Sequence, residues 1–185
     1  MKFIWIIVAL GVSWFSPSAY AELKDENLLQ GLPDGYVVGY EKRQGKQLIV
    51  EMVPKGETVE DWTEMLTTNI YFGGLGLTAE QFQVGISAQW KSNICPGSES
   101  KVLKNGVENG YPVSVWYLYC PNSRLSQKPE WTWFKAIQGN DSFYVVQKAW
   151  SREPDDDDIN RWIDYLGSVK LCDSRVADRQ CPSGQ

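Results

Sequence analysis

Histidine is absent from the sequence of 185 residues, and its absence excludes several kinds of chemistry. A Ser-His-Asp triad, a Cys-His pair and a histidine general base all need an imidazole. Zinc sites commonly use histidine or closely spaced cysteines, and the sequence has no C-x-x-C pair either. No other catalytic or ligand-binding motif takes their place, so we predict no catalytic residue, no bound metal and no cofactor.

Basic residues are in the minority. Lys and Arg number 18 against 23 Asp and Glu, which gives a net charge of −5 at neutral pH. Nucleic acids and anionic membrane surfaces are recognised through an excess of positive charge. The composition therefore argues against both as partners.

Long hydrophobic runs are limited to one, near the beginning of the chain. It spans residues 3–15, follows Lys2 and ends before Pro17. Ala19-Tyr20-Ala21 then places small residues at the two positions that a signal peptidase reads. The run is shorter than the roughly 20 residues of a membrane-spanning helix, which disfavours the alternative of an uncleaved anchor. We expect a signal peptide of residues 1–21 and a periplasmic or secreted protein.

Four cysteines are present, and all of them lie after the expected signal peptide. In an oxidising compartment an even number of cysteines indicates disulfide bonds, and four cysteines can pair in three ways. We favour Cys95–Cys120 and Cys172–Cys181, because each pair closes a local loop across a turn-rich stretch. A disulfide that closes a loop of this size stabilises a protein by about 2–4 kcal/mol, mainly by restricting the unfolded chain.

The chain after residue 21 has the length of one domain, since 185 minus 21 leaves 164 residues. Alternating apolar residues between turn signals predict strands in it. The predicted strands are 36–40, 47–53, 101–104, 112–119, 131–137 and 142–150. The predicted turns are 42–46, Asn105-Gly106, Asn109-Gly110 and 138–141.

Three helices are predicted from capping residues that precede an apolar stripe. The first begins at Thr58, with Asp61 in the reciprocal capping position, and continues to Ile70. The second begins at Thr78, with Gln81 completing the capping box. Its expected apolar face is Phe82, Ile86 and Trp90. The third begins at Pro154 and carries the stripe Ile159, Trp162, Ile163 and Leu166.

The predicted element order is β-β-α-α-β-β-β-β-α, with tight hairpins. This order favours an α+β fold, an antiparallel sheet with helices packed on it. We expect residues 22–185 to form this single domain. A loosely held lead-in would cover residues 22–33, and a polar C-terminal tail would follow Cys172.

Tryptophan is frequent, with nine residues in the sequence. Trp131 and Trp133 share a face of one predicted strand, and Trp116 faces opposite to Tyr117 on another. Exposed together, Trp116, Trp131 and Trp133 would form a binding surface for sugars or peptides. Packing in the core is the alternative, and it is the more common place for large aromatic residues.

The run from Asp155 to Asp158 has two interpretations. Its carboxylates could bind calcium, but the alternate ligands, central glycine and distal glutamate of an EF-hand loop are missing. Acidic residues in the first turn of a helix are also favoured by the helix dipole. We prefer the second interpretation.

Three segments resemble a family of small, uncharacterised exported proteins of proteobacteria. They are Pro54–Thr67, the turn Cys95-Pro96-Gly97, and Ile159–Cys172. More remotely, the order of elements around the Gly-Glu-Thr-Val-Glu-Asp-Trp segment is similar to the Mog/PsbP-like α/β/α sandwich. Members of that fold serve as accessory or binding proteins, so the resemblance implies a binding role rather than an enzyme.

The leading hypothesis is a non-enzymatic periplasmic binding or accessory protein whose partner is another envelope or secreted protein. A second hypothesis is an inhibitor or immunity protein for an exported toxin or hydrolase, because acidic surfaces cover cationic clefts. A third is an enzyme that uses carboxylates alone on glycans. It would need two carboxylates about 5–10 Å apart in a cleft, one with a raised pKa.

Overall fold

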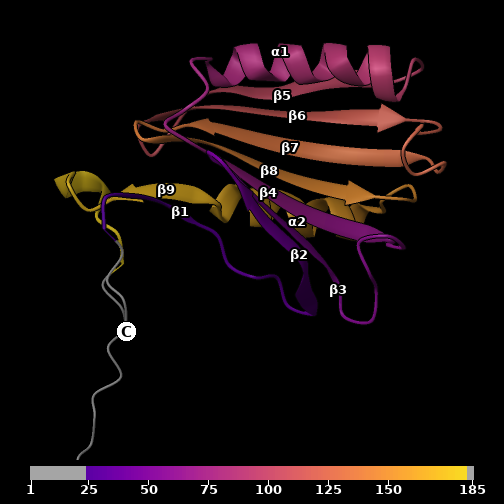
Figure 1. Ribbon diagram of the computed structural model, residues 1–185, viewed down its shortest axis with the longest axis horizontal. Coiled ribbons are helices and arrows are strands. Elements are labelled where there is room, and N and C mark those ends of the chain that lie inside the picture. Colours follow the sequence, from indigo (N-terminus) through magenta and orange to yellow (C-terminus); the bar gives the residue numbers. More distant parts are fainter. Residues whose placement is uncertain (1–23, 183–185) are drawn as a thin grey trace, which may run out of the picture.

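An antiparallel sheet of seven strands and two α-helices make up most of the structure, a computed structural model that describes residues 24–182 (Figure 1). The fold is therefore α+β, as predicted. The expected signal peptide, residues 1–21, lies outside the described residues. Among those residues, no helix is long and apolar enough to cross a membrane.

The strands of the main sheet follow the order β2-β3-β4-β8-β7-β6-β5. Their bounds are β2 Tyr36–Gln44, β3 Gln47–Pro54, β4 Glu64–Phe72, β5 Glu99–Glu108, β6 Tyr111–Cys120, β7 Glu130–Gln138 and β8 Ser142–Trp150. A smaller sheet pairs β1 (Glu26–Leu29) with β9 (Lys170–Asp173). The helices are α1 (Ala79–Gln89), which continues into the π-helical turn η1 (Trp90–Ile94), α2 (Asp156–Ser168), and the short 3-10 helix η2 (Ala177–Arg179).

The two α-helices pack on opposite faces of the main sheet. Successive side chains of a strand point to opposite faces. On β8, Phe143 belongs to a core with Phe82 of α1, whereas Tyr144 belongs to a core with Trp162 and Leu166 of α2. We refer to these as the α1 face and the α2 face.

The predicted hairpins of β2 with β3 and of β7 with β8 are present. β5 and β6, predicted as strands on either side of turn residues, also pair as a hairpin. β2 and β3 are joined by Gly45 and Lys46 alone, so the first turn is tighter than expected. Between β5 and β6 the turn is Asn109-Gly110, whose φ angles of 48° and 78° suit a tight hairpin turn. Asn105-Gly106 was predicted wrongly as a turn, since β5 continues through it and pairs with β6.

The predicted helix from Thr58 to Ile70 is wrong, because this region forms a loop and then strand β4. The local turn does form, since Asp61 N donates a hydrogen bond to Thr58 Oγ1 over 3.2 Å. The chain that follows contains β-branched and aromatic residues that suit a strand. β4 lies between β3 and β8 and is hydrogen-bonded to both, and this pairing overrides the helical spacing of its apolar residues.

The other two predicted helices are confirmed. Thr78 and Gln81 make a reciprocal capping box at the start of α1. At the start of α2, Asp155 is the N-cap, and its side chain accepts a hydrogen bond from Asp158 N over 2.8 Å. The acidic run therefore caps a helix in the structure, as the preferred interpretation expected.

The lead-in and the tail are more ordered than predicted. β1 pairs with β9, and the buried Glu26 of β1 accepts a hydrogen bond from Asn140 N over 2.6 Å. Both predicted disulfides, Cys95–Cys120 and Cys172–Cys181, are present. The second disulfide attaches β9 to the tail.

Candidate functional site

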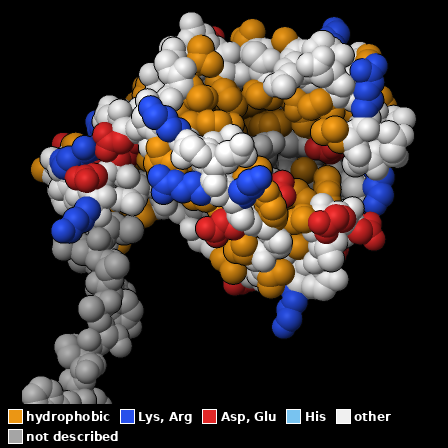
Figure 2. All heavy atoms as spheres, in the orientation of Figure 1, with side chains coloured by type: hydrophobic (Ala, Val, Ile, Leu, Met, Phe, Trp, Pro, Cys, Tyr) orange, Lys and Arg blue, Asp and Glu red, His pale blue; other side chains and the backbone are white. Residues whose placement is uncertain are grey.

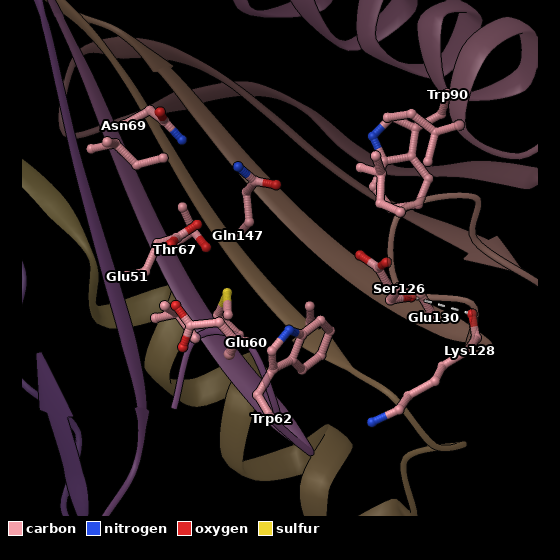
Figure 3. Close-up of a pocket in the computed structure, with 16 residues that line it drawn as sticks. Glu51, Glu60, Trp62, Thr67, Asn69, Trp90, Ser126, Lys128, Glu130 and Gln147 are labelled. Carbon is pink, nitrogen blue, oxygen red and sulfur yellow. Dashed lines mark hydrogen bonds between the residues drawn. The ribbon is translucent and has the colours of Figure 1, made fainter. Parts of the chain in front are cut away.

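A groove opens on the α1 face beside the helix. Helix α1 lies over β6 and β7, and the neighbouring surface of β3, β4 and β8 faces a cavity of about 580 Å³. The space-filling view shows this face hollowed, with hydrophobic side chains gathered around the hollow (Figure 2). We call this cavity the sheet groove, and Figure 3 shows the side chains that line it.

The floor of the sheet groove carries a polar row. Glu51 of β3 lies opposite Thr67 of β4, which in turn lies opposite Gln147 of β8. No side-chain hydrogen bond within the described chain engages any of these three residues. Asn69, two residues after Thr67 on the same face of β4, accepts a hydrogen bond from Gln47 Nε2 over 2.9 Å. Hydrogen-bonding groups are therefore available at the base of the groove.

One wall is the loop of residues 55–63. Its residues Val59 and Trp62 pack on an apolar cluster of the sheet that includes Met65. The loop is fixed by Glu57, whose carboxylate accepts hydrogen bonds from the backbone N–H of Thr63 (2.7 Å) and from its hydroxyl (2.6 Å). The indole of Trp62 is thus held beside the floor of the groove (Figure 3).

The opposite wall is formed by η1 and the loop of residues 121–129. Trp90 of η1 packs edge-on against Phe134, with ring centres 6.0 Å apart. The disulfide between Cys95 and Cys120 joins the end of η1 to the end of β6. Leu125, at the tip of the loop, is 78% exposed although it also lines the groove. This wall is therefore covalently anchored at its base and open to solvent at its rim.

An ion pair joins the two walls. Lys128 Nζ of one loop lies 3.2 Å from Asp61 Oδ1 of the other, with the lysine side chain half-exposed and the aspartate side chain exposed. Exposed pairs of this kind contribute roughly 0–1 kcal/mol. The pair can therefore open at little cost in free energy when a ligand enters.

The electrostatic character of the groove is acidic. Its lining contains Glu51, Glu60 and Glu130 against Lys128, and Lys128 is already paired with Asp61. Burial, and then the negative charge of Glu60, raise the pKa of Glu51. Burial also raises the pKa of Glu130, although hydrogen bonds from Thr132 and Ser123 oppose that shift. A positive charge in the groove would stabilise these carboxylates in their ionised form.

The structure separates the three tryptophans that the sequence grouped. Trp116 is 0% exposed and stacks on Phe134 at 4.7 Å, so it belongs to the core of the α1 face and to no accessible surface. Trp131 and Trp133 lie on the α2 face, half-buried, and line a second cavity of about 520 Å³ together with Tyr117 and Tyr119. We call this second cavity the aromatic hollow.

The acidic run of α2 is used within the fold. Asp158 is nearly buried and pairs with Arg152 (2.6 Å) and with Arg161 (2.8 Å). Within residues 24–182 no group of three or more Asp, Glu, Cys or His side chains is placed to hold a metal ion.

The sheet groove was not found from the sequence, although a signal was present. Glu51 interrupts the apolar run of β3, and Gln147 follows Val145-Val146 in the middle of β8. Strands that are buried on both faces are expected to be continuously apolar. Glu51 and Gln147 lie on the part of the α1 face that is beside α1 and lines the groove.

Comparisons with known proteins show a likeness of fold only. No family model matches the chain, and no curated protein matches its sequence. Among solved structures, it is similar to the Ran-binding protein Mog1p of Saccharomyces cerevisiae. The identity is 10%, the alignment covers 78% of this chain and 85% of Mog1p, and the TM-score is 0.44. At these values the similarity carries no argument about function.

Proposed function

We propose that this is a non-enzymatic binding protein that takes a basic side chain of a partner protein into the sheet groove. The observation that carries the proposal is a carboxylate at the floor of a groove whose two walls each present an indole. Glu51 supplies the carboxylate, and Trp62 and Trp90 supply the indoles.

Lysine and arginine match this arrangement because each has an apolar stem and a cationic head. The stem packs between the walls, where aromatic faces also attract a cation. The head reaches the polar row, where Glu51 and Gln147 accept hydrogen bonds. Ligand cavities typically measure roughly 300–1,000 Å³, so a groove of about 580 Å³ accommodates the side chain and part of its neighbours.

The charge of the groove supports the same ligand. Three glutamates line it, and the lysine in its lining is engaged by Asp61. Complementary charge across an interface favours encounter and suppresses the wrong partners. A neutral or acidic side chain would leave the half-buried Glu51 without a counter-charge.

The compartment is part of the proposal. Two disulfides fit an oxidising environment. We place the protein in the periplasm or the extracellular space after removal of residues 1–21, with an envelope or secreted protein as partner. An exported toxin or hydrolase that presents a basic residue would make it an inhibitor or immunity protein. We also propose that the chain has the Mog/PsbP-like sandwich fold, because of the order of its elements and because a helix packs on each face of its sheet.

Calorimetry with matched peptides tests the proposal. The purified protein is titrated with a peptide that carries one central lysine or arginine, and with its norleucine or citrulline analogue. We expect the basic peptides to bind and the neutral ones to bind at least tenfold more weakly. Glu51→Gln should remove that preference, whereas Glu41→Gln, at an exposed position of β2, should keep it. Equal binding of both peptides, or none at about 1 mM, where ΔG is near −4 kcal/mol, contradicts the proposal.

A carboxylate enzyme is the second candidate, and one observation favours it. Glu51 has a raised pKa and lies in the same groove as Glu60, whose charge contributes to that shift. A protonated and an ionised carboxyl are the acid and base of glycoside hydrolysis. Release of reducing ends from a glycan by the native protein, lost in Glu51→Gln, would support this candidate over the first.

A further inference from the structure

The aromatic hollow of the α2 face has a regular construction. Tyr117 of β6 lies opposite Trp133 of β7, and Tyr119 lies opposite Trp131, so four rings share one face of two neighbouring strands. The rings of Tyr119 and Trp131 are 4.7 Å apart with an interplanar angle of 35°. Trp133 packs edge-on against the buried Trp150, with centres 6.3 Å apart. The platform is therefore fixed to the core from below.

Polar atoms of these rings remain free to bind a ligand. No hydrogen bond within residues 24–182 uses the hydroxyls of Tyr117 and Tyr119 or the indole nitrogens of Trp131 and Trp133. These four donors are also not among the buried polar atoms without a partner. They are therefore accessible to solvent, on residues that line the hollow.

The rim of the hollow is acidic. Glu99 of β5 lies opposite Tyr119 at one side, and Glu153 precedes α2 at the other. Both carboxylates line the same cavity of about 520 Å³. The hollow thus combines flat aromatic surfaces, free donors and negative charge at its margin.

We propose that the aromatic hollow is a binding site for a proline-rich segment in the polyproline II conformation with a basic residue at its end. Such a segment has no internal hydrogen bonds, so its carbonyl groups are open to the four ring donors. Its proline rings pack on aromatic surfaces, the mode by which several peptide-binding domains recognise proline-rich chains. Its basic residue pairs with Glu99 or Glu153.

The spacing of the rings agrees with that ligand. Rings two residues apart on one strand are separated by about 7 Å, and diagonal rings on neighbouring strands by about 7–8 Å. One turn of polyproline II rises about 9 Å, so roughly one turn of the segment covers the four rings. An oligosaccharide could use the same rings and donors, because its hydroxyls both donate and accept hydrogen bonds. A neutral oligosaccharide is nevertheless the poorer match, since it has no positive charge to pair with Glu99 or Glu153.

This site is independent of the sheet groove, because it lies on the opposite face of the sheet. The test is therefore separate from the test of the proposed function. The Glu51→Gln variant, in which the sheet groove should have lost its preference for a basic side chain, is titrated by calorimetry with a ten-proline peptide that ends in arginine, and the substitutions below are made in that background. The matched control peptide has glycine in place of alternate prolines, and cello- and chito-oligosaccharides serve as the glycan probes.

We expect the proline peptide to bind at least tenfold more tightly than the glycine-substituted peptide. Trp131→Ala should weaken binding about tenfold, and Glu99→Gln should weaken it severalfold. Trp62→Ala, in the sheet groove, should leave binding unchanged. Circular dichroism spectra and thermal midpoints establish which variants are folded, and a misfolded Trp131→Ala is replaced by Tyr119→Ala.

Three results would overturn the proposal. The first is equal binding of the proline and glycine peptides, and the second is unchanged binding in folded variants of Trp131 and Tyr119. The third is binding of an oligosaccharide in preference to the proline peptide, which would assign the hollow to glycans. A failure of this test leaves the proposed function of the sheet groove standing, since Trp62→Ala and Glu51→Gln report on that groove alone.

Discussion

The ammonium nitrogen of Lys148 lies 2.7 Å from a carboxylate oxygen of Glu64, between the α2 face of the sheet and helix α2. The Lys148 side chain is 0% exposed, and its nitrogen also lies 4.1 Å from the centre of the Trp162 ring. Tyr36 completes the group, since its hydroxyl accepts a hydrogen bond from Lys148 and donates one to Glu64, each over 2.7 Å. The ion pair of Lys148 and Glu64, with Tyr36 and Trp162 around it, therefore connects β2, β4, β8 and α2.

Loss of one partner from this pair should destabilise the fold. In Glu64→Gln the fully buried ammonium group of Lys148 loses its counter-charge, and breaking a buried pair in this way costs about 3–5 kcal/mol. Urea denaturation measures the change in the free energy of unfolding. Glu41→Gln, at an exposed position, is the control and should change stability by no more than about 0.5 kcal/mol. A Glu64→Gln protein as stable as the control would show that the pair is not needed.

The stability of the native protein should rise with pH just above pH 8. Burial lowers the pKa of Lys148 to about 8, although the hydrogen bond to Glu64 opposes the shift. In the unfolded chain the pKa is about 10.4. Between these values the unfolded chain binds more protons, so the free energy of unfolding rises with pH, by on the order of 1 kcal/mol up to pH 10.

Above about pH 10, where an unfolded tyrosine ionises, the trend should reverse. Burial, with the hydrogen bond to Glu64, raises the pKa of Tyr36. The folded protein then holds a proton that the unfolded chain releases, so stability falls as the pH rises further. Denaturation curves at a series of pH values test both limbs. A stability that is flat or falling between pH 8 and 10 would contradict the assignment to Lys148, as would a rise that persists in Lys148→Met.

The two disulfides should contribute unequally. Cys95–Cys120 spans a sequence separation of 25 residues and Cys172–Cys181 one of 9. Loop-closure entropy gives roughly 3.5 kcal/mol for the first and roughly 2.5 kcal/mol for the second. Replacing each pair with serines and measuring urea denaturation compares them. The Cys95–Cys120 variant should also lose binding in the sheet groove, since this disulfide anchors one wall. A larger loss of stability on removal of Cys172–Cys181 than on removal of Cys95–Cys120 would contradict this prediction.

Gly139 should tolerate no side chain. A Cβ at this position would collide with the carboxylate of Glu26 and lie 2.7 Å from the carbonyl oxygen of Ser142. Gly139→Ala should therefore destabilise the protein by about 1–3 kcal/mol, as overpacking does. Gly85→Ala is the matched control, because nothing lies within 4 Å of its Cβ. In the middle of α1 that alanine should stabilise by up to about 1 kcal/mol. Equal thermal midpoints for the two variants would contradict this prediction.

Local signals predicted the parts of the fold that depend on neighbouring residues. The capping box of Thr78 and Gln81, the turn at Asn109-Gly110 and the apolar stripe of α2 are all read within a few residues of sequence. The pairing of Cys95 with Cys120 was also predicted correctly, because a short loop closes easily. In these cases the local preference and the tertiary structure agree.

Errors arose where distant strands decide the structure. The residues of β4 have helical spacing and a capping turn at Thr58, but their position between β3 and β8 makes them a strand. β1 and β9 were missed because each is short and pairs with the other across the length of the domain. No local pattern reports such a partner.

The candidate sites show the same division between features that depend on neighbouring residues and features that depend on distant strands. The shared face of Trp131 and Trp133 followed from strand periodicity, and both residues line the aromatic hollow. The sheet groove instead combines Glu51, Trp62 and Trp90, which come from a strand, a loop and a helical turn. Their proximity depends on the sheet order, which the sequence pattern did not provide.

Nuclear magnetic resonance of the tryptophan indole groups tests the central claim most directly. The ¹⁵N-labelled protein is titrated with the lysine or arginine peptide, and the indole N–H signals are assigned by single substitutions. We predict that the signals of Trp62 and Trp90 shift with a saturable dependence on the peptide, while those of Trp131 and Trp133 stay in place. Signals of Trp62 and Trp90 that do not move, or that move equally with the norleucine peptide, would contradict binding of a basic side chain in the sheet groove.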